Sequence, residues 1–306
     1  MSGDAIALYA RETAAFGARV ASALALLRRA AVEHPGRVVQ ATSLGAEDMV
    51  ITDLIAGHEL GIAIGTLQTG MLHAQTAALI PRIESRYAVE VEVEVYEPVI
   101  ESVVHFVGRH GERAMYDSIE LRKGCCAIRK LEPLARMLEG RSAWVTGMRR
   151  EQSANRGAVE FAELDDKGRS KFNPLADWSW ADVWHYIAVH GVPYNPLHDE
   201  FMPSIGCAPC TRAIAVGEDF RAGRWWWENE SAKECGLHVS PHSSDAAASV
   251  TSLGEVRSEL VPATANFDAA EVKGAPAPGQ SQDEGAKECG LHVHDESQVS
   301  MIGSPA

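Results

Sequence analysis

Four cysteines in two close pairs are the residues of this chain whose types and spacing suggest chemistry. Cys125 and Cys126 are adjacent in KGCCAIRK, and Cys207 and Cys210 form a Cys-x-x-Cys pair in GCAPCTR. Adjacent cysteines rarely bond to each other, because a disulfide across one peptide bond is strained. Four thiolates around one site suit a structural zinc ion or an iron–sulfur cluster. Inert buried thiols are the alternative, which two such pairs disfavour. The spacing alone does not choose the metal.

A further cysteine, Cys235, stands apart from both pairs in KECGLH. A nucleophilic thiol needs thiolate character, which nearby cations favour. Lys233 and His238 can supply positive charge, whereas Glu234 opposes it. The octapeptide AKECGLHV occurs at 232–239 and again at 286–293, around Cys289. This repeat is either a duplication of the gene's end or a second reactive cysteine on a tether.

Two segments are candidates for binding anions. The segment SLGAED, residues 43–48, lies between a predicted strand and a predicted helix. Backbone N–H groups at such a helix N-terminus bind phosphate, although a plain strand–helix connection is the commoner explanation. The segment GMRREQS, residues 147–153, and the next few residues bring together Arg149, Arg150 and Arg156. Arginine matches phosphate and sulfate through its planar fork of donors.

The elements that must position these residues alternate in type. We predict a helix over 5–33, strands over 37–42, 62–67, 89–95 and 143–146, and helices over 49–60, 73–86, 128–138 and 180–190. Residues 98–122 also have a helical pattern, and 171–175 are predicted as a strand and turn. This β-α-β order predicts an α/β fold, with a doubly wound, mostly parallel sheet and its ligand at the carboxyl edge of the strands.

The tryptophans divide into two groups. We expect Trp178, Trp180 and Trp184 to pack in the core. The run Trp225–Trp227 cannot face one core on any regular element, so at least one of its indoles should be partly exposed.

Composition narrows the function classes. The chain has 306 residues, a hydrophobic content of 46% and a net charge of −14. That charge argues against general nucleic-acid binding. We find neither an apolar run of membrane-spanning length nor a secretory signal pattern, so we expect no membrane association. Cysteines used as metal ligands fit a reducing cytoplasm, which is the predicted location.

The C-terminal part differs in composition from the rest. Residues 240–306 hold ten Asp and Glu against three Lys and Arg, and Phe267 is their only Phe, Tyr or Trp. Such a segment cannot bury enough apolar surface to offset its ordering entropy. We therefore expect a catalytic domain over residues 1–239 and a disordered acidic tail over 240–306.

Taken together, the strings KGCCAIRKLEPL, GCAPCTRAI, GRWWWE and KECGLH resemble the iron–sulfur adenylyl-sulfate (APS) reductases of assimilatory sulfate reduction and cysteine biosynthesis. The resemblance runs from about residue 35 to residue 239. It implies the adenine-nucleotide alpha-hydrolase-like (PP-loop) fold. It also implies that APS is reduced to sulfite and AMP through an enzyme S-sulfocysteine, with thioredoxin as the electron donor.

The resemblance assigns roles to individual residues. It implies that a [4Fe–4S] cluster is held by Cys125, Cys126, Cys207 and Cys210, and that Cys235 is the nucleophile. The modified PP-loop with Ser43, Gly45 and Ala46 would hold the nucleotide phosphates. The expected cationic and polar contacts to the substrate are Lys130, Arg149, Arg150, Arg221, Arg224 and His238. We expect Cys235, not Cys289, to carry the reaction, because only Cys235 follows Glu228 by a short connector.

One segment departs from the family pattern. The family usually has Asp-Thr-Gly-Arg-Leu where this chain has Gln-Thr-Gly-Met-Leu, residues 68–72. Gln68 therefore stands in place of the acidic residue, and Met71 in place of the arginine. An arginine there would be a natural nucleotide contact, so its absence leaves reduction of phosphoadenylyl sulfate (PAPS) as the nearest alternative function. A PP-loop enzyme that adenylates another substrate is a second alternative. A redox-sensing binding protein is a third. The sequence leaves open whether the chain forms a homo-oligomer.

Overall fold

The computed structural model describes residues 4–87, 92–153, 156–215 and 217–228. Their central element is a six-stranded sheet in the order β3-β2-β1-β4-β6-β5. The strands are β1 (Val38–Thr42), β2 (Ala63–Leu67), β3 (Val93–Tyr96), β4 (Ala143–Val145), β5 (Ala162–Leu164) and β6 (Ser170–Phe172). The strands β3, β2, β1, β4 and β6 pair in parallel, and β5 pairs antiparallel with β6. The predicted doubly wound, mostly parallel sheet is confirmed.

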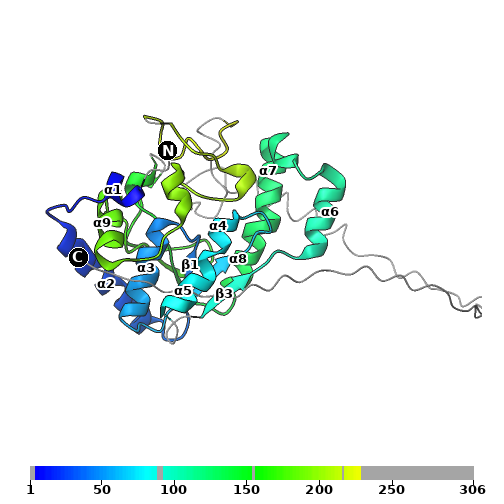
Figure 1. Cartoon of the computed structure of the whole chain (residues 1–306). Coiled ribbons are helices and arrows are strands. Elements are labelled where there is room, and N and C mark those ends of the chain that lie inside the picture. The colour runs from blue at the N-terminus through cyan, green and yellow to red at the C-terminus, as the bar shows by residue number, and fades with distance from the viewer. Residues whose placement is uncertain (1–3, 88–91, 154–155, 216, 229–306) are drawn as a thin grey trace, which may run out of the picture. The chain divides into compact units, whose positions relative to one another are not determined.

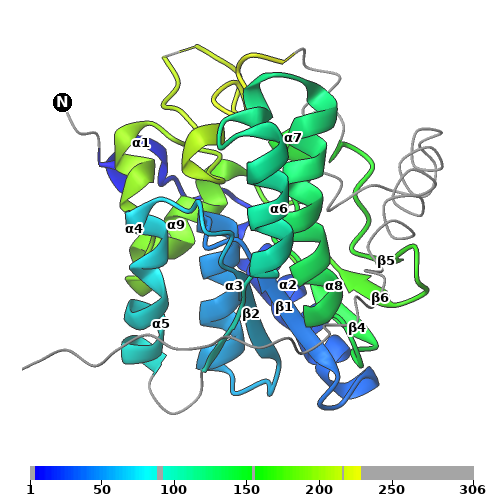
Figure 2. The same ribbon diagram turned by 90° about the vertical axis from the view of Figure 1, so that its right-hand side faces the viewer.

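Helices cover both faces of the sheet, as Figures 1 and 2 show. Figure 1 places β1 between α3 and α8. The helices are α1 (Ala5–Tyr9), α2 (Phe16–Glu33), α3 (Ala46–Gly57), α4 (Ala74–Ala77), α5 (Leu79–Tyr87), α6 (Ile100–His110), α7 (Ile119–Cys126), α8 (Glu132–Met137) and α9 (Trp180–His190). A π-helical stretch, η2 (Ala127–Leu131), joins α7 to α8, and short 3-10 helices include η3 (Arg150–Gln152), η5 (Pro196–Glu200) and η6 (Ala208–Cys210).

Alternating side chains of the central strands fill two separate hydrophobic layers. Val38 and Val145 are buried in the large cluster that includes residues of α2, α3, α5 and α9. Their neighbours Val39 and Trp144 are buried against α8 on the other face. Successive residues of a strand point to opposite faces, so this alternation is what a sheet covered on both sides requires.

Several predicted elements differ in the structure. The helix predicted over 5–33 is two helices, because Ala10 adopts an extended conformation after α1. The helix predicted over 73–86 is divided into α4 and α5 at residue 78. Helix α3 begins at Ala46, before the predicted start at 49. Strand β5 was not predicted, since its three residues are at most half-buried and are too few to establish an alternating apolar pattern.

Other expectations are confirmed. Helix α9 has the predicted bounds and begins with a capping box, in which Ser179 and Asp182 hydrogen-bond reciprocally. Trp178 and Trp184 are fully buried, and Trp180 packs against the same cluster. Among the adjacent tryptophans, Trp225 is buried, whereas Trp226 is 40% exposed.

Within the described ranges, no helix combines the length and the apolar character needed to cross a membrane. The predicted division into residues 1–239 and a disordered tail remains a prediction, because residues 229–306 lie outside the described part of the chain.

Candidate active site

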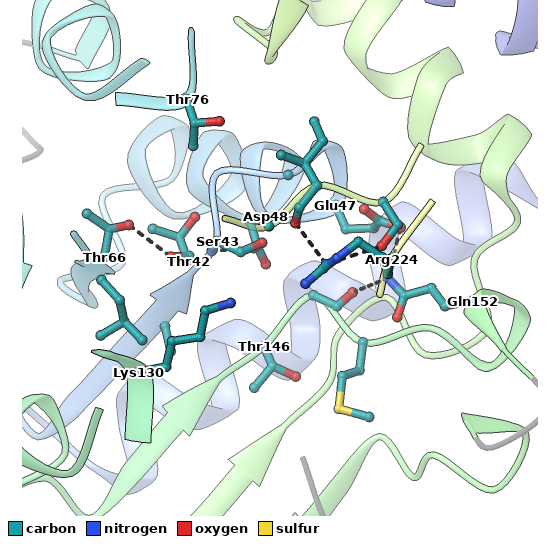
Figure 3. Close-up of a pocket in the computed structure, with 18 of the residues that line it drawn as sticks. Thr42, Ser43, Glu47, Asp48, Thr66, Thr76, Lys130, Thr146, Gln152 and Arg224 are labelled. Carbon is teal, nitrogen blue, oxygen red and sulfur yellow. Dashed lines mark hydrogen bonds between the residues drawn. The ribbon is translucent and has the colours of Figure 1, made fainter. Parts of the chain in front are cut away.

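A cavity of about 190 Å³ lies at the carboxyl edge of the sheet. It is lined by residues at the ends of β1, β2 and β4. In the sheet, β2 lies on one side of β1 and β4 lies on the other, so the order of the strands reverses at β1. This is the switch point at which open α/β sheets bind ligands. We call it the large cavity. Figure 3 shows the polar side chains around it, among them Ser43, Asp48, Thr66 and Thr146.

The loop after β1 begins the wall of the large cavity. Gly45 is the N-cap of α3, so the unpaired N–H groups of the first helical turn lie next to Ser43 and Gly45, which both line the cavity. Leu44 has a positive φ of 61°, and its backbone N–H donates to Thr42 Oγ1 at 3.0 Å. Ala46 is fully buried as the first residue of α3. The predicted anion-binding loop is thus placed at a helix N-terminus.

Asp48 fixes this loop. Its Oδ2 accepts hydrogen bonds from the backbone N–H and the hydroxyl of Ser43, both at 2.6 Å. Burial raises the pKa of this carboxyl group from 3.8 to about 6. Gly147, at the end of β4, passes so close that a Cβ there would lie 2.4 Å from Asp48 Oδ1. Asp48 therefore lies between two loops that both line the large cavity.

The two arginines predicted after β4 are placed differently from each other. Arg149 is 1% exposed and donates through Nε to Glu47 at 2.9 Å. Gln152 donates to the same carboxylate oxygen at 2.9 Å. Arg150 turns to the carbonyl of Val159, at 2.8 Å. The described lining of the large cavity includes neither arginine but does include Glu47, so Arg149 pairs with the carboxylate of a lining residue.

The positive charge of the large cavity comes from four basic side chains: Lys130, Arg156, Arg221 and Arg224. Figure 3 shows the Lys130 ammonium and the Arg224 guanidinium turned toward the same space. Arg221 and Arg224 are 8% and 7% exposed. Because buried cations hold anions strongly, the large cavity can bind a ligand with more than one negative charge.

All four cysteines of the two predicted pairs line a second, smaller cavity, which we call the cysteine cavity. Cys125 and Cys126 end α7, and Cys207 and Cys210 flank and end η6. Both halves contact the loop after β2: Ala208 N–H donates to the carbonyl of Met71 at 2.7 Å, and Arg129, three residues after Cys126, donates through Nη1 to the carbonyl of Thr69 at 2.7 Å. All four cysteines are free thiols. The sequence-predicted ligand set is therefore brought together.

The four thiols of the cysteine cavity are a donor set that suits an iron–sulfur cluster, and also a zinc ion. Within the described residues, no set of three or more His, Cys, Asp or Glu side chains is arranged to hold a metal ion. Burial raises the pKa of Cys125, and that of Cys210 to about 12, so these thiols need bound metal to become thiolates.

The departure from the family pattern lies beside the cysteines. Met71 lines the cysteine cavity and packs with Cys125 and Cys207. Gln68 accepts a hydrogen bond from Gly70 N–H at 3.2 Å. Neither belongs to the described lining of the large cavity. The expectation that position 71 would contact the nucleotide therefore has no support from this geometry.

His198 is a lining residue that sequence reasoning missed. It lies on η5, is 2% exposed, and contacts Trp180 and Trp184. Burial lowers its pKa to about 4, so the imidazole is neutral near pH 7. A lone histidine after Pro196 gives no pattern that could have identified it. Cys235, His238 and Cys289 lie outside the described residues.

Three comparisons relate this chain to known proteins. Residues 37–213 match the family model described as "Phosphoadenosine phosphosulfate reductase domain". An adenosine 5′-phosphosulfate reductase of Neisseria meningitidis serogroup A is 55% identical over 65% of this chain and 81% of the relative. The protein of the same name from Allochromatium vinosum is 53% identical over 72% of this chain and 85% of the relative.

One solved structure supports the same relationship. A PAPS reductase from Candida auris, in a phosphate complex, superposes with a TM-score of 0.53 at 30% identity. The match covers 61% of this chain and 88% of the Candida auris chain. The resemblance found in the cysteine and KECGLH strings is confirmed, and this chain belongs to the phosphoadenosine phosphosulfate reductase family, which includes the APS reductases.

Proposed function

We propose that this protein reduces APS to sulfite and AMP, with thioredoxin as electron donor, as a step of assimilatory sulfate reduction toward cysteine. The observation that carries the proposal is the pair of adjacent cavities. One has a helix N-terminus and four basic side chains for a nucleotide anion. The other gathers the four cysteines that the family resemblance implies as ligands of an iron–sulfur cluster.

Substrate binding uses the loop and the cations in different ways. The phosphate of APS lies against Ser43, Gly45 and the first turn of α3, where N–H groups and the helix dipole favour negative charge. Lys130, Arg221 and Arg224 face the sulfonate and the bridging oxygen. Arg149 keeps Glu47 neutralised, which limits repulsion between that carboxylate and the substrate.

The chemistry proceeds in two transfers. The Cys235 thiolate attacks the sulfur of APS, forms a sulfur–sulfur bond to the sulfonate, and breaks the bond between that sulfur and the bridging oxygen. AMP leaves with the electron pair. A thioredoxin thiolate then attacks the Cys235 sulfur, and sulfite leaves with the electrons of the sulfur–sulfur bond. The second thioredoxin thiol resolves the mixed disulfide, so thioredoxin is oxidised and Cys235 is restored.

We propose that Cys125, Cys126, Cys207 and Cys210 hold a [4Fe–4S] cluster. When bound, the cluster keeps these four sulfurs as thiolates and supplies local electrostatic and structural support, since thioredoxin supplies the electrons. Lys130 lines both cavities, so its ammonium can offset the negative charge of the thiolates while contacting the substrate. We further propose a cytoplasmic protein whose residues 1–239 form the catalytic unit.

PAPS reduction is the alternative. The relatives named above as APS reductases are 55% and 53% identical to this chain, whereas the solved PAPS reductase is 30% identical. Together with the four cysteines, this difference favours APS. The position of Met71 removes the main reason for doubting it, because that side chain packs with the cysteines.

The test is sulfite release with purified thioredoxin and each nucleotide in turn. We expect kcat/KM for APS to exceed that for PAPS by at least tenfold. A preference for PAPS would reject the assignment of substrate. Failure to release sulfite from either nucleotide, while ATP is consumed with a third substrate, would favour the adenylating class of PP-loop enzymes.

A further inference from the structure

The large cavity and the cysteine cavity are separated by a wall that contains Trp225. This residue and Lys130 are lining residues of both cavities. Trp225 is 1% exposed, and its backbone N–H donates to the carbonyl of Cys210 at 3.4 Å. The preceding residue, Arg224, forms an antiparallel bridge with Thr211. The backbone of residues 224–225 is therefore attached to the second cysteine pair.

Two guanidinium groups lie over the Trp225 indole. The Cζ atom of Arg122 is 4.6 Å from the ring centroid, and that of Arg224 is also 4.6 Å away. Arg122 lines the cysteine cavity, whereas Arg224 lines the large cavity. A cation over an indole face is attracted by the ring quadrupole, most strongly where water is excluded. The indole thus contacts one cation from each cavity.

The backbone and the ion pairs around Trp225 hold the ring in place. Trp225 has a positive φ of 42°, a conformation that bulky residues rarely adopt and that persists only where the surrounding structure holds it. Arg122 donates through Nε and Nη2 to the carboxylate of Glu228, at 2.8 Å each. Arg122 and Glu228 are 0% and 3% exposed. A buried, bidentate ion pair therefore fixes the Arg122 guanidinium against the indole, on the side of the cysteine cavity.

We propose that Trp225 is a positioning residue that fixes the Arg224 guanidinium for the anionic part of the nucleotide and joins its position to the cysteine site through Arg122. The inference rests on the proposed function, because the nucleotide in the large cavity belongs to it. The indole acts through Arg224. Its removal therefore weakens binding of ligands in proportion to their charge, and ligands without charge are unaffected.

The experiment compares AMP with adenosine by isothermal titration of the full chain as purified. The Trp225→Leu substitution keeps an apolar side chain and removes the ring. We expect it to lower AMP affinity roughly tenfold, as expected for loss of a desolvated cation–π contact, and to leave adenosine affinity unchanged. The Trp225→Phe variant keeps a weaker ring face and should lose about twofold for AMP. The Trp226→Leu variant is the matched control and should change neither affinity, because Trp226 is 40% exposed and does not belong to the described lining.

A second measurement tests whether the indole acts through Arg224. In an Arg224→Gln background, adding Trp225→Leu should cause no further loss of AMP affinity, because coupled residues are non-additive. Full additivity would overturn the proposal. An equal loss of AMP and adenosine affinity in Trp225→Leu would also overturn it, because the indole would then stack directly on the base. If Trp225→Leu does not fold, the AMP affinities of Trp225→Phe and Arg224→Gln test the proposal instead. A small loss in Trp225→Phe and a larger loss in Arg224→Gln would support it, and no loss in Trp225→Phe would overturn it. Wild-type protein that binds neither ligand would reject the proposed function itself.

Discussion

Asp48 Oδ2 lies 2.6 Å from both the backbone nitrogen and the hydroxyl oxygen of Ser43, so one buried carboxylate holds the residue at the start of the anion-binding loop. The same side chain is in close contact with Gly147, which lies on the loop after β4 and also lines the large cavity. The shape of the proposed nucleotide site therefore depends on an acidic residue next to the loop that we propose binds the phosphate of APS. Figure 3 shows Asp48 and Ser43 side by side at this edge.

The first prediction concerns the pH dependence of stability. The pKa of Asp48 is raised by burial from 3.8 to about 6. A raised pKa contributes stability that is fully present below the ordinary pKa and is lost as pH rises through the folded-state pKa. The Asp48→Asn variant does not lose this stability as the pH rises, because an amide does not ionise. We expect the free energy of unfolding of the variant, relative to wild type, to improve by about 1 kcal/mol between pH 5 and pH 8. Urea unfolding at both pH values measures it, and a pH-independent difference would contradict it.

The second prediction concerns the close approach of the two walls. A Cβ at position 147 would lie 2.4 Å from Asp48 Oδ1 and 3.0 Å from Glu47 Cβ, so Gly147→Ala must displace one of the two loops. We expect KM for APS to rise at least tenfold. The control is Gly57→Ala at the end of α3, where a Cβ would meet nothing within 4 Å. Equal effects of the two substitutions on KM would show that the contact with Asp48 is unimportant.

The third prediction compares two ion pairs. Removing the Glu228 carboxylate leaves the fully buried Arg122 guanidinium without its two hydrogen bonds from that side. We expect Glu228→Ala to lower the free energy of unfolding by about 3 kcal/mol. The exposed pair of Arg29 and Glu33 on α2 is the control, and Glu33→Ala should cause no measurable loss. Denaturant unfolding of both variants measures the two losses. Similar losses of free energy of unfolding would contradict the structural importance of the buried pair.

The fourth prediction concerns the cysteine cavity. The purified protein should be brown and contain about four irons per chain, as a [4Fe–4S] cluster requires. Cys207→Ser should bleach the visible absorption band, while Cys289→Ser should not. Iron analysis and visible spectroscopy measure both effects. A colourless protein with stoichiometric zinc would overturn the cluster assignment.

Some features of the fold were accessible from sequence because local and global signals agree. The apolar run ending at Thr42, followed by small residues and a helix, gave β1 and α3 nearly in full. The start of α9 was predicted correctly, and the capping box formed there by Ser179 and Asp182 is a local pattern. The two cysteine pairs could be joined because a shared metal site brings distant segments together.

Other features depend on tertiary contacts that a linear pattern does not contain. Arg149 stays a predicted substrate contact, but its pairing with Glu47 could not be predicted, because the two residues are far apart in the sequence. Strand β5 exists because β6 offers an edge for antiparallel pairing, not because of its own alternation. His198 and Trp225 gain their positions from the packing of η5 and from the backbone bridge at Arg224.

The proposed reaction depends on a sulfonate bound to Cys235. The most direct test is mass spectrometry of the protein after incubation with APS and without thioredoxin. We expect one added sulfonate, located on the Cys235 peptide, which thioredoxin removes as sulfite. We also expect the adduct to survive truncation after Ser240 and to be absent in Cys235→Ser. A sulfonate found mainly on the Cys289 peptide, or sulfite release that persists in Cys235→Ser, would contradict the proposed reaction.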